Sequence, residues 1–160
     1  MFCPETFPII EGHEPVAASA VVDTCRAVSL ENAVGVFILI DYHANSNVDT
    51  LCTVHEGATA AEAVAGTYNI TTGAEFPIWA VAAAGTDNTW VRQADGLSYN
   101  IDANVITHCM VGFYIAASKL TNNRKYVHLG TDTGGTGLMN VVYILDGARY
   151  QQVTPPEAIA

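Results

Sequence analysis

Histidine and cysteine are the side chains in this 160-residue chain with the most direct capacity for metal binding and nucleophilic chemistry. The five histidines stand at positions 13, 43, 55, 108 and 128, and none has the spacing of an HExxH helix or a zinc finger. Cys52 and His55 make half of such a pattern, but in a strand they would point to opposite faces. The sequence therefore predicts no metal site and no cofactor.

One triplet matches a catalytic signature, Asp132-Thr133-Gly134, in which a pair of aspartates shares a proton and activates water in aspartic proteases. A chain of this length would have to dimerise to supply the second aspartate. The triplet continues directly into Gly-Thr-Gly at residues 135–137, and such a run is typical of a turn between strands. We therefore predict a turn and no enzymatic activity; an aspartic-type protease that uses Asp132 is the alternative.

Composition and charge narrow the class of protein. Hydrophobic residues make up 50% of the chain and charged residues 14%, which is typical of one globular domain rather than a disordered chain. The net charge is -10 with six Lys and Arg, so a phosphate backbone would be repelled and nucleic-acid binding is not expected. The longest apolar runs, residues 34–40 and 76–85, are too short to cross a bilayer as helices, so we expect no membrane partner.

The start of the chain has neither a basic segment nor an apolar one, so we expect no secretory signal. The four cysteines lie far apart without a CxxC pair. We therefore expect reduced thiols that behave as small buried hydrophobic side chains.

Strand patterns dominate the chain. Residues 34–40 place apolar side chains on both faces of a strand, which predicts a central strand of a sheet. Residues 48–55 alternate after a loop of hairpin length, so we predict an antiparallel hairpin with the preceding strand. Asp-Gly at residues 95–96 separates residues 90–94 from 97–102 and predicts a second hairpin with a type I′ turn.

About ten short strands at regular spacing predict an all-β fold, an antiparallel β-sandwich of the jelly-roll or the immunoglobulin-like kind. A capping box at Thr59 and Glu62, followed by Gly66, predicts at most one short helix. Prolines cluster near both ends of the chain and favour extended backbone. We therefore expect an extended N-terminal arm at residues 1–15, a single sandwich domain at 16–150 and an extended C-terminal tail at 151–160.

The apolar strand at residues 34–40, the segment Tyr-Val-His-Leu at 126–129 and the ending Leu-Asp-Gly-Ala-Arg-Tyr at 145–150 resemble small structural proteins of tailed bacteriophages. The pattern is similar to capsid decoration (cement) proteins and related head components. This resemblance implies a non-enzymatic virion protein that is made in the host cytoplasm and binds the outer surface of the capsid. It implies the major capsid protein and further copies of the chain, as a trimer, as partners.

The terminal arms suit such a role because multivalent attachment multiplies modest single contacts. We expect the partner contacts to come from apolar side chains of the two arms, namely Phe2, Phe7, Ile9, Ile10, Tyr150, Pro155 and Ile159. A phage tail, neck or head-fibre component with the same composition is one alternative. A carbohydrate-binding sandwich in which Trp79 and Trp90 stack on sugars is another.

Overall fold

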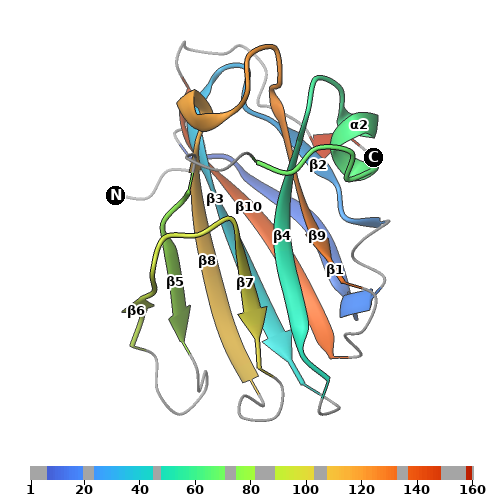
Figure 1. Ribbon diagram of the computed structural model, residues 1–160, viewed down its shortest axis with the longest axis vertical. Helices are drawn as coiled ribbons and strands as arrows, with labels where there is room; N and C mark the ends of the chain where they lie inside the picture. Colours follow the sequence, from blue (N-terminus) through green and yellow to red (C-terminus); the bar gives the residue numbers. More distant parts are fainter. Residues whose placement is uncertain are drawn as a thin grey trace.

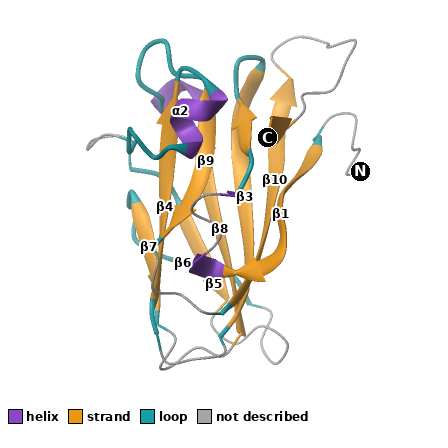
Figure 2. Cartoon of the chain, turned by 90° about the vertical axis from the view of Figure 1, so that its right-hand side faces the viewer, coloured by secondary structure: helices purple, strands orange, loops and turns teal. Residues whose placement is uncertain are grey.

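The computed structural model describes residues 7–19, 24–44, 48–70, 75–81, 89–102, 108–132, 137–148 and 158–159. These residues form two antiparallel sheets that face each other, with one short helix at one end (Figures 1 and 2). The predicted all-β sandwich is confirmed. None of the helices in these ranges is long and apolar enough to span a membrane.

The first sheet has six strands in the order β1-β10-β3-β8-β5-β6. Their bounds are β1 Ile9–Ala17, β10 Leu138–Ala148, β3 Ala33–His43, β8 His108–Ala116, β5 Ile78–Val81 and β6 Val91–Arg92. The second sheet has five strands in the order β11-β2-β9-β4-β7. Their bounds are β11 Ala158–Ile159, β2 Ala27–Ser29, β9 Tyr126–Thr131, β4 Thr50–Gly57 and β7 Ser98–Ile101. Between strands lie helix α2 (Ala60–Val64) and a 3-10 turn η1 (Ala117–Lys119).

The pairing of early strands with late strands defines the topology. β1 pairs with β10, β2 with β9, β3 with β8 and β4 with β7, and all four pairs are antiparallel. Successive pairs alternate between the two sheets. One long hairpin wound around a sandwich gives this arrangement, which is the jelly roll. The structure therefore decides between the two sandwich types that the sequence left open, and β5, β6 and β11 extend the jelly roll at its edges.

Both predicted hairpins are wrong for the same reason. β3 lies in the six-stranded sheet and β4 in the five-stranded sheet, so the loop between them crosses from one layer to the other. Likewise β6 pairs with β5, whereas β7 pairs with β4 in the opposite sheet. Gly96 forms a bridge with Phe76 instead of a tight reversal. In a jelly roll, neighbours in sequence face each other across the core, and hairpin signals cannot show this.

β3 is the central strand that the sequence predicted, hydrogen-bonded to β10 on one side and β8 on the other. Its alternate side chains Val36, Ile38, Ile40 and Tyr42 are fully buried between the sheets. The largest buried side chains of the core are Tyr42, Tyr143, Phe76, Phe113, Ile38, Ile40, Ile78, Ile101, Ile115, Leu129, Met139 and Leu145. The buried Tyr143 hydroxyl accepts the Leu129 N–H at 3.0 Å, so this polar group is satisfied across the two sheets.

The terminal segments are part of the sheets where the structure describes them. The boundary expected at residue 15 lies inside β1, because residues 9–17 pair with β10 along one edge of the six-stranded sheet. Residues 158–159 form β11, which pairs with β2 at the edge of the other sheet. Residues 1–6 and 149–157 lie outside the described ranges.

The helix follows its sequence signals. The side chain of Thr59 accepts the Glu62 N–H at 3.2 Å, and Glu62 Oε2 accepts the Ala58 N–H at 2.9 Å. Gly66 ends the segment with a positive φ of 63°, which glycine adopts at low cost. α2 packs on the outer face of β4 and β9. The predicted capping box and stop are confirmed.

A buried carboxylate joins β4 to the turn before β9. The Glu56 side chain is fully buried and accepts hydrogen bonds from Arg124 at 2.6 Å, from the Thr121 N–H at 2.9 Å and from the Thr121 hydroxyl at 2.5 Å. The Arg124 guanidinium also lies 3.7 Å from the centre of the Tyr68 ring. Because a buried charge needs a partner, this network fixes the turn that leads into β9.

We predict that Arg124→Leu lowers the free energy of unfolding by about 3 kcal/mol, because it leaves the Glu56 carboxylate buried without its cation. Urea denaturation followed by circular dichroism measures the change. Arg26→Leu is the matched control, since Arg26 is exposed, and it should change the stability by less than about 0.5 kcal/mol. Equal losses in the two variants would contradict the role of the network.

Candidate functional site

The outer face of the six-stranded sheet carries apolar side chains at its centre, although such a face is commonly polar when it meets water. Six of them lie in neighbouring positions of β10, β3, β8 and β5, and Ile9 of β1 continues the row. We call this set the apolar band: Ile9, Phe37, Leu39, Trp79, Met110, Val142 and Ile144. Ile9 is 52% exposed, and the other six are partly exposed. A contiguous, partly exposed apolar surface of this kind is a candidate interaction site.

A glycine at the centre of the band allows its two large rings to meet. Gly112 of β8 lies between Leu39 and Trp79 in the register. A Cβ atom at Gly112 would stand 2.3 Å from the Phe37 ring, so only glycine leaves room for that ring to lie over β8. The Phe37 and Trp79 ring centres are 6.0 Å apart, and the Arg92 guanidinium covers Trp79 at 4.9 Å. The centre of the band is therefore packed and preformed.

Polar side chains border the band at both ends of the strands. At one end the Tyr114 hydroxyl donates to Asp146 at 2.6 Å, and burial together with this bond raises the pKa of Tyr114 to about 12. At the other end Asp41, His43 and His108 come together. An apolar centre with a polar rim is the usual anatomy of a protein–protein interface.

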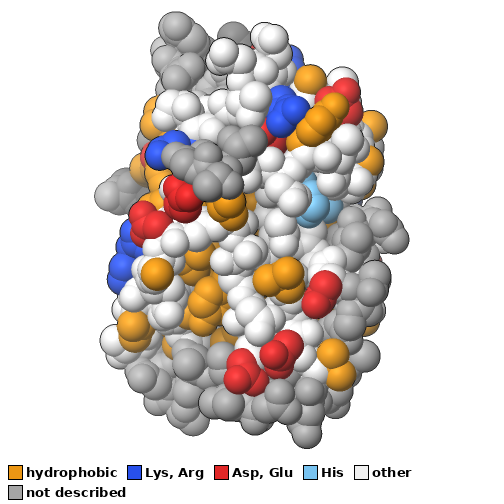
Figure 3. Space-filling model, in the orientation of Figure 1, with side chains coloured by type: hydrophobic (Ala, Val, Ile, Leu, Met, Phe, Trp, Pro, Cys, Tyr) orange, Lys and Arg blue, Asp and Glu red, His pale blue; other side chains and the backbone are white. Residues whose placement is uncertain are grey.

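The outer face of the five-stranded sheet differs from the band. In Figure 3, which looks onto β4, β7 and β9, hydrophobic side chains are scattered among polar and acidic ones. Leu51 of β4 is an exposed example at 38%. Single exposed hydrophobic side chains of this kind are ordinary on a protein surface. The two faces of the sandwich therefore differ in their capacity to bind a partner.

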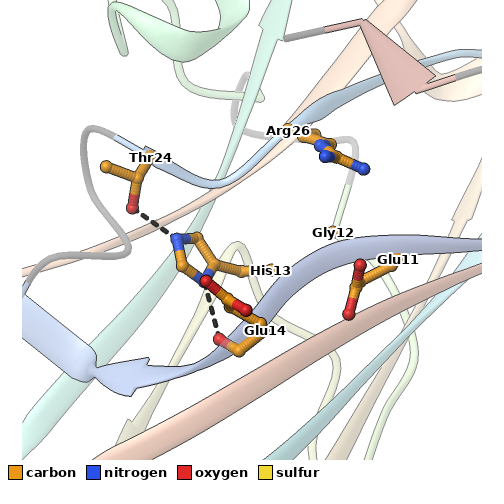
Figure 4. A pocket seen from close by; sticks show the side chains of 6 residues that line it. All are labelled: Glu11, Gly12, His13, Glu14, Thr24 and Arg26. Carbon is orange, nitrogen blue, oxygen red and sulfur yellow. Dashed lines mark hydrogen bonds between the residues drawn. The ribbon is translucent and has the colours of Figure 1, made fainter.

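A polar cavity of about 220 Å³ lies beside β1 (Figure 4). Its lining residues are Glu11, Gly12, His13, Glu14, Thr24 and Arg26. The Nδ1–H of His13 donates to the Glu14 carbonyl at 2.6 Å, and Nε2 then accepts from the Thr24 hydroxyl at 2.6 Å. This volume is below the range of about 300–1,000 Å³ that is usual for small-molecule sites. The cavity fits water or a small ion better than an organic substrate.

The edge of β1 that faces away from β10 carries features that oppose pairing with a further strand. The register of β1 is irregular between Glu11 and His13 and again between His13 and Val16. Glu11, Glu14 and Pro15 are exposed on this edge. Bulges, charges and proline are the devices that prevent edge-to-edge association of sheets. A partner is therefore better accommodated on the face of the sheet than on this edge.

The structure separates the side chains that were expected to contact a partner. Ile9 lies in the apolar band and Phe7 is half-buried just before it. Ile10 was expected at the same surface, but it points to the opposite face of β1 and packs in the core with 9% exposure. Ile159 lies in β11, at the edge of the other sheet. The remaining three, Phe2, Tyr150 and Pro155, lie outside the described residues.

The band itself was missed because its members come from five separate segments of the sequence. The alternation in β3 already puts Phe37 and Leu39 on one face, and the sequence interpretation took that face as buried within the sheet packing. Only the register with β10 and β8 adds Val142, Ile144 and Met110 to the same surface.

The side chains considered for catalysis have no catalytic setting in the described ranges. Asp132 is exposed at the end of β9, and the two residues that complete its triplet lie outside the described residues. Cys25, Cys52 and Cys109 are free and buried. Burial raises the pKa of Cys25 to about 11 and that of Cys109 to about 12, which disfavours the reactive thiolate. The expected burial is confirmed for these three cysteines.

Two histidines, one buried and one half-buried, meet on the side of the five-stranded sheet that α2 covers. His55 of β4 and His128 of β9 stand opposite each other, with ring centres 5.9 Å apart. His128 is 1% exposed, and neither of its ring nitrogens has a hydrogen-bond partner in the part of the chain that the structure describes. Burial, with the neighbouring His55, lowers the pKa of His128 to about 4. His128 is therefore a buried and neutral side chain at neutral pH.

Comparison with known proteins gives no relative: no protein-family model, no curated protein and no solved structure matches this chain. The functional argument therefore rests on the residues and their geometry.

We predict that burial of His128 makes the fold less stable in acid. The unfolded chain takes up a proton as the pH falls through 6.5, whereas folded His128 stays neutral down to a pKa of about 4. Stability therefore falls with falling pH, by about 2 kcal/mol between about pH 7.5 and about pH 5. His128→Leu should reduce the fall by that amount when urea denaturation is measured at both pH values. An unchanged fall in this variant would show that other groups cause it.

Proposed function

We propose that this protein is a virion structural protein that binds the outer surface of a phage capsid and stabilises the shell. The observation that carries the proposal is the apolar band on the outer face of the six-stranded sheet. The likeness to capsid decoration proteins supports the choice of partner, and two of the segments that carry that likeness, residues 34–40 and 126–129, lie in β3 and β9. The partners are the major capsid protein and further copies of the chain in a trimer.

The band has the physical properties of a docking surface. Its side chains are partly exposed, and transfer of apolar surface out of water stabilises a complex by about 25 cal/mol per Å². The Phe37 and Trp79 rings lie against each other over Gly112, so little side-chain freedom remains to be lost on binding. The polar groups at both ends of the band favour one orientation of the partner.

The charge of the chain favours the outside of the shell. With a net charge of -10, the protein is repelled by packaged DNA but not by an exterior protein surface. A protein that binds only the assembled lattice shifts the equilibrium toward that lattice by mass action. Several subunits joined in one trimer would increase the strength of attachment through effective concentration.

The protease and carbohydrate-binding alternatives draw less support from the geometry than the capsid proposal does. A tail, neck or head-fibre component would use the same kind of surface, and its location in a cryo-EM map of the particle would distinguish it. Protease chemistry at Asp132 needs a second carboxylate, and Asp132 is exposed at a strand end. In a carbohydrate-binding sandwich a tryptophan ring would stack on a sugar. The Trp79 ring is already covered by Arg92 and contacts Phe37. Trp90, which is 39% exposed, is therefore the better candidate for stacking.

We predict that Leu39→Glu weakens binding to capsids that lack this protein by about 100-fold, or roughly 3 kcal/mol, because a carboxylate would be desolvated at the centre of the interface. Co-sedimentation with expanded capsids measures the affinity. Light scattering measures the oligomeric state, and so shows whether the trimer forms. A point substitution is preferable to deletion of residues 1–15, since that deletion would remove most of β1.

Leu51→Glu is the matched control, because Leu51 is exposed on the outer face of the opposite sheet. It should leave capsid binding and oligomeric state unchanged. Capsid binding that is equal in the two variants would overturn the assignment of the band as the docking surface.

A further inference from the structure

Three side chains from two strands converge at one end of the apolar band. Asp41 and His43 are two residues apart on β3 and therefore share its outer face. His108, the first residue of β8, stands directly opposite His43 in the register. Asp41 Oδ1 lies 2.9 Å from His108 Nε2 and 3.9 Å from His43 Nε2, and one ligand atom from each residue lies within 4.8 Å of the others.

These distances fit coordination of a single ion. Around a tetrahedral zinc ion with nitrogen and oxygen ligands, donor atoms stand about 3.3 Å apart. The distances from the Asp41 carboxylate bracket that value, so small side-chain rotations would bring the three donors into place. The two imidazole rings are stacked with centres 3.7 Å apart, which holds both rings beside the same carboxylate.

The chemistry of the donors selects the class of ion. Two imidazoles and one carboxylate suit Zn²⁺ and neighbouring transition metals, whereas Mg²⁺ and Ca²⁺ prefer oxygen ligands alone. The side chains of Asp41 and His43 are 42% and 54% exposed, so an ion can enter from solvent and a water molecule can take the fourth position. Three protein ligands with one open position form a recognised type of zinc site.

We propose that Asp41, His43 and His108 bind one Zn²⁺ ion per chain at the end of the apolar band. The ion replaces the Asp41–His108 hydrogen bond and joins β3 to β8 at the end of the sheet where the pairing of these strands begins. This site is independent of the docking proposal, because it needs no partner chain.

Titration of the chelator-treated 160-residue chain with ZnCl₂ in a calorimeter tests the site. We expect saturable binding of one ion per chain and a rise in the melting temperature, since an ion that binds only the folded state stabilises it. His43→Ala, His108→Ala and Asp41→Asn should each weaken the affinity by about tenfold or more, which is at least the effect of losing a supporting contact. Co²⁺ in place of Zn²⁺ should give visible absorption bands that the three variants lose.

His13→Ala is the matched control, because His13 lies on β1 with its ring nitrogens bonded to Glu14 and Thr24. It should leave the stoichiometry and affinity unchanged, and circular dichroism should show that all four variants remain folded. Absence of saturable binding would overturn the proposal. Binding that survives in His43→Ala and His108→Ala would do the same, since the ion would then occupy another site.

Discussion

Burial of one face of β3, β8 and β10 against the opposite sheet is the constraint on which the rest of the structure depends. Every second side chain of β3 from Val36 to Tyr42 is fully buried, and the inward positions of its two neighbours are buried as well. Because side chains alternate along a strand, burial of one face of each strand also determines which residues point outward. Phe37, Leu39, Met110, Val142 and Ile144 of the apolar band occupy outward-facing positions of these strands. The side chains of Asp41, His43 and His108 occupy outward-facing positions of β3 and β8.

The jelly-roll winding explains why the functional surfaces are assembled from distant segments. Each early strand pairs with a late one, so β3 receives β8 on one side and β10 on the other. Residues from 65 apart (His43 and His108) to 115 apart (Ala33 and Ala148) therefore become neighbours across the sheet. This topology requires pairing between strands that are far apart in the sequence. The buried Glu56 network stabilises the turn that leads into one of these strands, β9.

The two outer faces of the sandwich have different roles in this interpretation. α2 covers part of the five-stranded sheet and buries His128, so the helix completes the core on that side. The six-stranded sheet has no helix over its band in the described ranges, and its apolar side chains remain partly exposed. The β1 edge of this sheet carries bulges, charges and a proline that oppose strand pairing. Together with the apolar face that no described helix covers, these features support the proposal that the face binds another protein. The jelly roll itself is compatible with many activities, so the proposal rests on this face and not on the fold.

The sequence by itself determined the local features, because their causes are local. The alternation and β-branched residues of residues 34–40 identified a central strand, and the capping box at Thr59 and Glu62 with Gly66 identified the helix and its end. Hydrophobic content, charge and strand spacing indicated one all-β sandwich. Each of these local features depends on residues that are close together in the sequence.

Tertiary structure alone decided the pairing and everything built on it. Asp-Gly at residues 95–96 is a strong hairpin signal, yet its flanking strands pair in opposite sheets, since burial of both inner faces outweighs a turn preference. Ile9 and Ile10 are chemically alike, but only the position of β1 on the sheet edge makes one exposed and the other buried. His43 and His108 have no spacing that links them in sequence. They meet because β3 and β8 share a register, and a register is set by the whole core.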